Sequence, residues 1–291
     1  MRLVTFDTGA SARPGVVDGD HVVPVDGLPG VTSVLDVLGR LGELRAALAH
    51  LRRSAVPLDE ARLGPPLAPR AVMATGTNYR SHVEEMGVDA PPVPNAGFVK
   101  LPGSVCGHLA AIELPAGGFV DYEGEVAVVI GAPARDVPED AAEHVIAGLC
   151  LANDVSSRDA PMAHLVLAKG APGFCPLGPA LVTLDEVRID DVEFRVLVNG
   201  EERQHAHASD MVHPIRAIVS SFSRALPLSP GDVILTGSPG GVGIALEPPR
   251  PLRPGDTVEV ISPQLGRLAN TFIAAAASDD DIRAAAATTS T

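Results

Sequence analysis

The sequence predicts a strand-rich α+β protein, with a small N-terminal α+β domain followed by a mixed β-sheet roll. Short runs of β-branched residues bounded by Gly, Pro, Asn or Asp dominate the chain after about residue 70. These runs do not alternate regularly with helices, which disfavours a doubly wound sheet. The proline-rich segment 63–69, LGPPLAP, interrupts helices and sheet ladders alike, so we expect domains at 1–66 and 67–291.

The N-terminal domain is expected to contain two strands and one helix. Apolar residues bounded by turn signals predict strands around Leu3–Phe6 and His21–Pro24. Leucine and valine recur at intervals of three and four from Ser33 to Leu51, which predicts an amphipathic helix. Thr32 or Ser33 is available as its N-cap.

The larger domain is expected to be mostly strand, with few helices. Asn199-Gly200 predicts a hairpin turn, and helices are expected at Pro138–Leu149 and Met211–Leu226. The tail from about residue 275, rich in Ala, Asp and Thr, has little to bury and is expected to fray. The clearest strand predictions are Val126–Ile130, Phe194–Val198, Val233–Leu235 and Thr257–Ile261.

Composition points to an enzyme that acts on small molecules. A formal net charge of −14 argues against nucleic-acid binding, because that affinity needs clustered Lys and Arg. Three cysteines, Cys106, Cys150 and Cys175, without C-x-x-C spacing suggest neither a disulfide framework nor a zinc knuckle. The sequence has no export signal and no long apolar run, so we expect a cytoplasmic protein that does not engage a membrane.

Two carboxylates stand directly before the expected strand Val126–Ile130. Strand alternation puts Glu123 and Glu125 on one face, about 7 Å apart along the chain. That face continues through Ala127 and Val129 into apolar surroundings, where two unpaired anions would be costly. A hard cation relieves that cost: Mg²⁺ or Mn²⁺, with Ca²⁺ as a further candidate. A solvated strand face explains the same spacing without a metal.

A third carboxylate follows the apolar run Val145–Ala152. Asp154 lies in the segment 153–159, NDVSSRD, where it could face a central site at the end of that run. The alternative is a turn or cap, because Asn, Asp and Ser are also the residues that turns use.

The segment 76–87, GTNYRSHVEEMG, carries a candidate acid–base pair. His82 and Glu85 become neighbours if this segment is helical, and a carboxylate beside an imidazole orients the ring as a base. Such a pair can activate water. A crowded, solvated helix is the alternative.

Lysine is rare here: only Lys100 and Lys169 occur among 22 basic residues. Their compact, titratable ammonium groups can serve catalysis in ways that guanidinium cannot easily mimic. Gly237–Gly243 is glycine-rich but lacks the features of a P-loop or a dinucleotide site, so a tight substrate-facing turn is expected there.

Seven ordered motifs together resemble the fumarylacetoacetate hydrolase family. The resemblance runs from about Ala71 to Asn270, and the N-terminal unit resembles the family's small leading domain. The motifs are GTNYRSHVEEMG, the Phe98-Val99-Lys100 step, DYEGEVAVVIG, NDVSSRD, GFCPLGP, VNGE and PGDVILTGSPGGVG.

The resemblance implies a role for each candidate residue. It implies Mg²⁺ or Mn²⁺ on the three carboxylates, a water-activating dyad and two active-site lysines. It also implies a homodimer acting on a small carboxylic acid, a 2-oxo acid or β-diketone acid, whose carbon–carbon bond is hydrolysed through an enolate stabilised by the metal. The implied metal ligands are Glu123, Glu125 and Asp154, the catalytic residues His82, Glu85, Lys100 and Lys169, and the substrate contacts Arg158, Thr236 and Tyr79.

The chain departs from the family pattern on the substrate side. Pro161 replaces a polar residue in the step after Arg158, and 170–173 reads GAPG where a polar stretch is usual. These changes favour a larger or specialised substrate, or a changed reaction. Isomerisation, decarboxylation or dehydration of a 2-oxo or sugar acid at the same metal site is the alternative, and a catalytically silent ligand-binding homologue is a further one.

Overall fold

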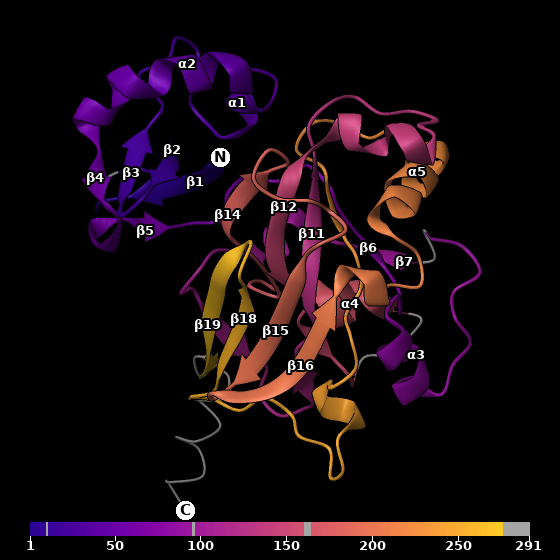
Figure 1. Ribbon diagram of the computed structural model, residues 1–291. Coiled ribbons are helices and arrows are strands. Elements are labelled where there is room, and N and C mark those ends of the chain that lie inside the picture. The colour runs from indigo at the N-terminus through magenta and orange to yellow at the C-terminus, as the bar shows by residue number, and fades with distance from the viewer. Residues whose placement is uncertain (10, 95–96, 160–163, 276–291) are drawn as a thin grey trace, which may run out of the picture.

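The computed structural model describes residues 1–9, 11–94, 97–159 and 164–275 (Figure 1). The tail expected to fray, and Pro161, lie outside the described residues. The described part is strand-rich and mixed, which confirms the predicted fold class. None of the described helices is both long and apolar enough to cross a membrane.

The larger sheet combines strands of the N-terminal unit with strands of the larger domain. It is mostly antiparallel, but β17 (Val233–Leu235) pairs in parallel with β6 (Val72–Thr75), and β8 (Val105–Cys106) pairs in parallel with β14 (Cys175–Thr183). Two short strands join at its sides: β5 (Arg62–Leu63) pairs with β1, and β8 (Val105–Cys106) with β14. Across the sheet the order is β4 (Val56–Pro57), β3 (His21–Pro24), β2 (Arg13–Asp18), β1 (Arg2–Asp7), β14 (Cys175–Thr183), β12 (Ile146–Asn153), β11 (Gly124–Ile130), β17 (Val233–Leu235), β6 (Val72–Thr75) and β7 (Gly97–Lys100).

A smaller sheet packs against the centre of the larger one, as Figure 1 shows for β15 and β18 in front of β11 and β12. A short ladder of β10 (Val120–Asp121) and β13 (Ser156–Ser157) lies beside the acidic residues. The order in the smaller sheet is β16 (Glu201–His207), β15 (Glu193–Val198), β18 (Thr257–Ser262), β19 (Gly266–Ala274) and β9 (Ala111–Leu114).

Alternation along β11 divides two hydrophobic cores. Val126 and Val128 point into the core between the two sheets, which α5 (Ile215–Ala225) also fills. Ala127 and Val129 point into the other core, which they share with side chains of the N-terminal unit. The face of β11 that carries Glu125 is therefore apolar along its remaining length, as the sequence predicted.

The N-terminal unit joins the larger sheet directly, because β1 pairs with β14. The two predicted strands are confirmed, and β2 was not predicted because its Pro14-Gly15 step is typical of turns. The division at residue 66 stays a prediction.

The predicted first helix is interrupted. It forms α1 (Leu35–Leu38) and α2 (Leu41–Leu51), with Gly39 at the break. The predicted N-cap is wrong: α1 has Val34 as its N-cap, and the Thr32 and Ser33 hydroxyls donate to the Asp36 carboxylate and do not cap the helix.

One helix prediction in the larger domain is wrong. Instead of a helix at Pro138–Leu149, a 3₁₀ segment (Glu139–Val145) leads into β12 at Ile146. The second half of the predicted helix is an apolar run buried on both faces, and periodicity alone does not separate such a strand from a buried helix.

The second helix prediction, the strand predictions and the turn prediction for the larger domain are confirmed. The predicted helix at Met211–Leu226 is confirmed in its core as α5, and the hairpin turn Asn199-Gly200 has positive φ at both residues. The segment with the candidate dyad forms α3 (Arg80–Met86), and α4 (Leu165–Lys169) carries one of the lysines.

We expect Leu149→Ala to lower the free energy of unfolding by about 2–5 kcal/mol, because it removes a fully buried side chain from the core between the sheets. Urea unfolding followed by circular dichroism measures this. Leu167→Ala, at a side chain 70% exposed on α4, is the control and should change the same quantity by less than about 0.5 kcal/mol. Equal effects of the two substitutions would contradict the placement of β12 in the core.

Candidate metal centre

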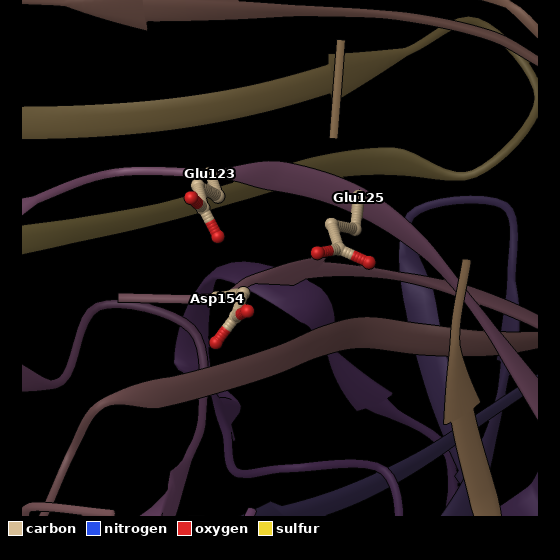
Figure 2. A group of neighbouring side chains, drawn as sticks. All are labelled: Glu123, Glu125 and Asp154. Carbon is tan, nitrogen blue, oxygen red and sulfur yellow. The ribbon is translucent and has the colours of Figure 1, made fainter. Parts of the chain in front are cut away.

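The register of β11 and β12 brings the three predicted carboxylates together. Glu125 lies opposite Ala152, and the Asp154 N–H donates to the Glu123 carbonyl one step beyond the ladder (2.7 Å). One ligand atom from each of Glu123, Glu125 and Asp154 lies within 4.8 Å of the others (Figure 2). The three side chains are buried, so their charges need partners within the protein or a bound cation.

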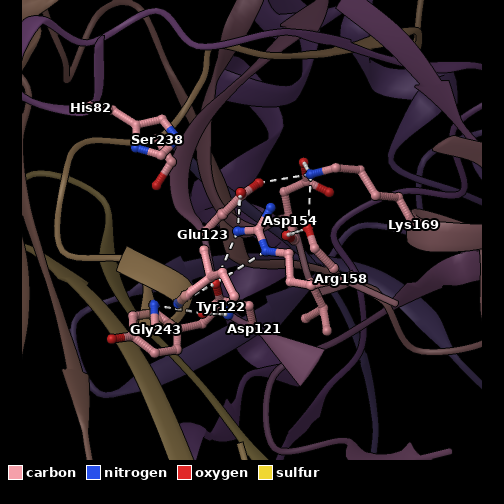
Figure 3. Close-up of polar contacts among 12 residues, drawn as sticks. His82, Asp121, Tyr122, Glu123, Asp154, Arg158, Lys169, Ser238 and Gly243 are labelled. Atoms are coloured by element: carbon pink, nitrogen blue, oxygen red, sulfur yellow. Dashed lines mark hydrogen bonds and ion pairs between the residues drawn. The ribbon is translucent and has the colours of Figure 1, made fainter. Parts of the chain in front are cut away.

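Three cationic side chains surround this acidic cluster, Glu123, Glu125 and Asp154. Lys169 Nζ donates to Glu123 (2.7 Å) and Asp154 (2.5 Å), and Lys100 Nζ donates to the other Asp154 oxygen (2.5 Å). Arg158 bridges Glu123 (2.6 Å) and Asp121 (2.9 Å), as Figure 3 shows. The structure thus brings both predicted lysines and Arg158 to the predicted metal ligands.

The two glutamates of the cluster have opposite pKa shifts. Burial by itself raises the pKa of Glu123, but the charges of Lys169 and Arg158 more than offset it, and the pKa lies well below its ordinary range. Burial, then the charges of Asp154 and Glu123, raise the pKa of Glu125 well above its ordinary value of 4.5. No cationic side chain contacts Glu125 among the described residues; a backbone N–H from Gly237 does (2.5 Å).

The donor set fits a divalent cation. It consists of carboxylate oxygens, which hard ions such as Mg²⁺ and Mn²⁺ prefer. A cation held between the three carboxylates would supply the charge that Glu125 lacks, and each carboxylate oxygen that already accepts a hydrogen bond has a second lone pair. These carboxylates could therefore hold a metal ion.

The candidate dyad forms on α3. His82 Nδ1 and Glu85 Oε2 are 2.9 Å apart, and His82 is buried. Because Nδ1 is held by the carboxylate, Nε2 is the ring nitrogen left to exchange a proton with a ligand. His82 and the acidic cluster line the same cavity.

The glycine-rich segment Gly237–Gly243 connects the dyad to the cluster. Its backbone N–H groups donate to three carboxylates: Gly237 to Glu125 (2.5 Å), Gly241 to Glu85 (2.7 Å) and Gly243 to Asp121 (2.7 Å). A larger residue cannot replace Gly241, because its Cβ would lie 1.8 Å from a backbone oxygen. The segment is therefore a backbone strap that orients acidic side chains.

The shared cavity has a volume of about 380 Å³. Lys169, Arg158 and Ser238 line it, whereas Tyr79 and Thr236 are not among its lining residues. The Thr236 hydroxyl donates to the Val126 carbonyl (2.9 Å), whereas Ser238, two residues further along the chain, is one of the hydroxyl side chains that line the cavity. The substrate contacts predicted for Tyr79 and Thr236 stay predictions.

Sequence reasoning did not single out Ser238 or Asp121. Ser238 could have been found from its place in the glycine-rich motif. Asp121 had no signal beyond its place before Glu123, and only the fold shows that it joins Arg158 to the strap (Figure 3). A larger hollow of about 530 Å³ near Cys106 and Pro172 contains none of the acidic cluster.

Comparison with known proteins identifies the family. A family model described as the C-terminal part of fumarylacetoacetate (FAA) hydrolase matches residues 71–273, which span the cluster, the dyad and the strap. The chain belongs to the fumarylacetoacetate hydrolase family. This confirms the resemblance read from the seven motifs, and named members of the family are hydrolases, isomerases and tautomerases.

Three similar proteins cover nearly the whole chain. The mitochondrial oxaloacetate tautomerase fahd2 of Xenopus laevis is 33% identical over 290 residues, covering 94% of this chain and 90% of the relative. A probable 2-hydroxyhepta-2,4-diene-1,7-dioate isomerase from Mycobacterium abscessus is 35% identical with a TM-score of 0.81, covering 94% and 98%. Maleylpyruvate hydrolase from Sphingobium sp. SYK-6, solved with manganese(II) and pyruvate, is 28% identical with a TM-score of 0.81, covering 94% and 99%.

We expect Glu125→Gln to make the metal-free protein more stable than the wild type, by an amount that grows with pH. The raised pKa of Glu125 means that its contribution to stability is fully present below about pH 4.5 and is lost as the pH rises through the folded-state pKa. A glutamine mimics the protonated form and does not undergo this loss.

Urea unfolding from pH 4 to pH 8 in the presence of a chelator measures the difference between the two proteins. Glu113→Gln, at an exposed glutamate of β9, is the control and should follow the wild type at every pH. A constant difference between Glu125→Gln and the wild type would contradict the expectation.

Proposed function

We propose that this chain is a divalent-cation-dependent enzyme that transfers a proton at a small 2-oxo acid or β-diketone acid. The observation that carries the proposal is the shared cavity: His82, oriented by Glu85, faces the same space as Glu123, Glu125 and Asp154. A cation at the cluster would supply the positive charge that binds the carboxylate and 2-oxo oxygen and stabilises an enolate. We propose Mg²⁺ or Mn²⁺, and the manganese in the Sphingobium enzyme supports this choice.

The leading reaction is hydrolysis of a carbon–carbon bond in an acylpyruvate-like acid. His82 Nε2 takes a proton from water, and the water oxygen attacks the carbonyl of the acyl arm. The bond between that carbonyl carbon and the adjacent CH2 then breaks, and the proton passes to this CH2 of the departing three-carbon fragment. Both lysines hold the acidic cluster in place: Lys169 Nζ donates to Glu123 and Asp154 at the cavity wall, and Lys100, fully buried behind Asp154, donates to that carboxylate.

Keto–enol tautomerisation or isomerisation is the second candidate. It is supported by the geometry of the dyad: Glu85 holds His82 Nδ1, and Nε2 is left for proton exchange in the cavity that the acidic cluster lines, a transfer that needs no attacking water. The tautomerase and isomerase names of the 33% and 35% identical relatives support it as well.

Assembly and location are proposed on narrower grounds. A homodimer is proposed on the family resemblance. A cytoplasmic location is proposed because Cys106, Cys150 and Cys175 are all free thiols, as in a reducing compartment.

We expect Glu123→Ala to abolish both Mn²⁺ binding and turnover, because it removes one of the three carboxylates and leaves Lys169 partly unpaired. Calorimetric titration with Mn²⁺ and an assay against a panel of acylpyruvates and 2-oxo acids measure the two effects. Glu43→Ala, at a solvent-exposed glutamate of α2, is the control for a general loss of acidic charge. Full activity of Glu123→Ala without metal would refute the proposal.

We expect His82→Ala to impair either candidate reaction, because the dyad transfers the proton in both. Hydrolysis should fall by roughly 10²–10⁴-fold, because general-base catalysis contributes that much. Binding of pyruvate, which depends on the acidic cluster, should be nearly unchanged. A hydrolytic rate that survives His82→Ala would exclude the dyad as the water-activating group, and enol conversion without any cleavage by the wild type would favour tautomerisation.

A further inference from the structure

The wall of the shared cavity beyond the acidic cluster and its cations has no charged residue in the described part, apart from the dyad. Three elements contribute apolar side chains to this wall: Met86 from α3, Phe98 from β7 and Leu165 from α4. The remaining side chains there are the neutral hydroxyls of Thr75, Thr77 and Ser238.

The cations of the site are already paired. Lys169 Nζ donates to Glu123, Asp154 and Ser156, which occupies its three hydrogens. Lys100 is fully buried and does not line the cavity. No lysine in the described cavity wall is therefore left to receive a second anionic group of a ligand.

The remaining two basic groups are also committed. Arg158 uses Nε and Nη2 on Asp121 and Glu123, which leaves Nη1 for one ligand oxygen near the cluster. A protonated His82 would be neutralised by Glu85. Neither group offers an unpaired charge at the apolar wall.

The charge balance allows one carboxylate. Four carboxylates, Asp121, Glu123, Glu125 and Asp154, face three cations, so a divalent ion would convert an excess of one negative charge into one positive charge. The carboxylate of a 2-oxo acid cancels that charge. A second carboxylate against Met86, Phe98 and Leu165 would lose part of its hydration to their apolar side chains and would gain no unpaired cationic partner there.

We propose that the substrate of this site carries a single carboxylate, at its 2-oxo end, and an uncharged apolar acyl arm that lies against Met86, Phe98 and Leu165. This inference rests on the proposed function, since the acidic cluster places the 2-oxo end. It separates this chain from its Xenopus relative, because oxaloacetate carries two carboxylates. Dicarboxylic 2-oxo acids are poor ligands of this cavity.

Two unreactive ligands of equal carbon number test the proposal on the full chain with Mn²⁺. 2-Oxohexanoate ends in a methyl group and 2-oxoadipate ends in a second carboxylate. Neither has the 4-oxo carbonyl that water would attack, so neither is hydrolysed and calorimetry reports binding. We expect 2-oxohexanoate to bind at least about tenfold more tightly, which corresponds to about 1.4 kcal/mol. Pyruvate, which lacks the arm, is the reference for the 2-oxo end.

A charge introduced into the wall should invert this preference. Met86 is 44% exposed, so Met86→Arg can place a guanidinium at the cavity without a buried charge. We expect Met86→Arg to bring the two dissociation constants together or to favour 2-oxoadipate. Met86→Gln, the neutral control, should keep the wild-type preference, and Leu165→Arg is a second variant from a different element should α3 not tolerate arginine.

The outcomes distinguish the two levels of the proposal. If the wild type binds 2-oxoadipate as tightly as 2-oxohexanoate or more tightly, the single-carboxylate inference is overturned. Binding of pyruvate in the same experiment would still uphold the proposed function. Failure of all three acids to bind overturns both.

Discussion

The buried charge network at the ends of β11 and β12 is the interaction on which the site depends. Lys169 lies between Glu123 and Asp154, Lys100 holds the far oxygen of Asp154, and Arg158 joins Glu123 to Asp121. Breaking such a buried pair leaves an uncompensated charge, which costs far more than the intact pair contributes. The network therefore requires every member, yet it leaves Glu125 without a cationic partner among the described residues. That imbalance is the physical reason to expect a divalent ion there.

The glycine strap follows from the same constraint. At Gly241 and Gly243 a Cβ would collide with neighbouring backbone oxygens, so only glycine lets the segment pass close enough for its N–H groups to reach the carboxylates. Backbone N–H groups of this short segment thereby hold three carboxylates in place. They are Glu125 of the cluster, Glu85 of the dyad, and Asp121, which pairs with Arg158. The position of the proton-transfer group is coupled to the position of the metal ligands through backbone atoms, which side-chain substitution cannot easily loosen. The motif thus serves carboxylates of the protein instead of phosphates of a cofactor.

The site has two parts with different chemical roles: the acidic cluster with its base, and the rest of the cavity wall. An acidic cluster with a nearby base can serve hydrolysis, isomerisation or tautomerisation, because negative charge develops on the 2-oxo oxygen in each. The reaction and the substrate must then be selected by the rest of the wall. In this chain that wall is uncharged and partly apolar, with Met86, Phe98 and Leu165 from three different elements. Its composition favours an acyl arm over a second acid group.

The sequence by itself determined the parts that depend on local periodicity. Strand alternation put Glu123 and Glu125 on one face, and a spacing of three put His82 beside Glu85 once the segment formed a helix. The same local reasoning failed at Pro138–Leu149, because an apolar run buried on both faces has no period to read. Only the tertiary structure decided the cation pairs, the strap contacts and the wall of the cavity. These join residues far apart in the chain, such as Asp121 and Gly243, and their meeting depends on strand register and packing that no local pattern encodes.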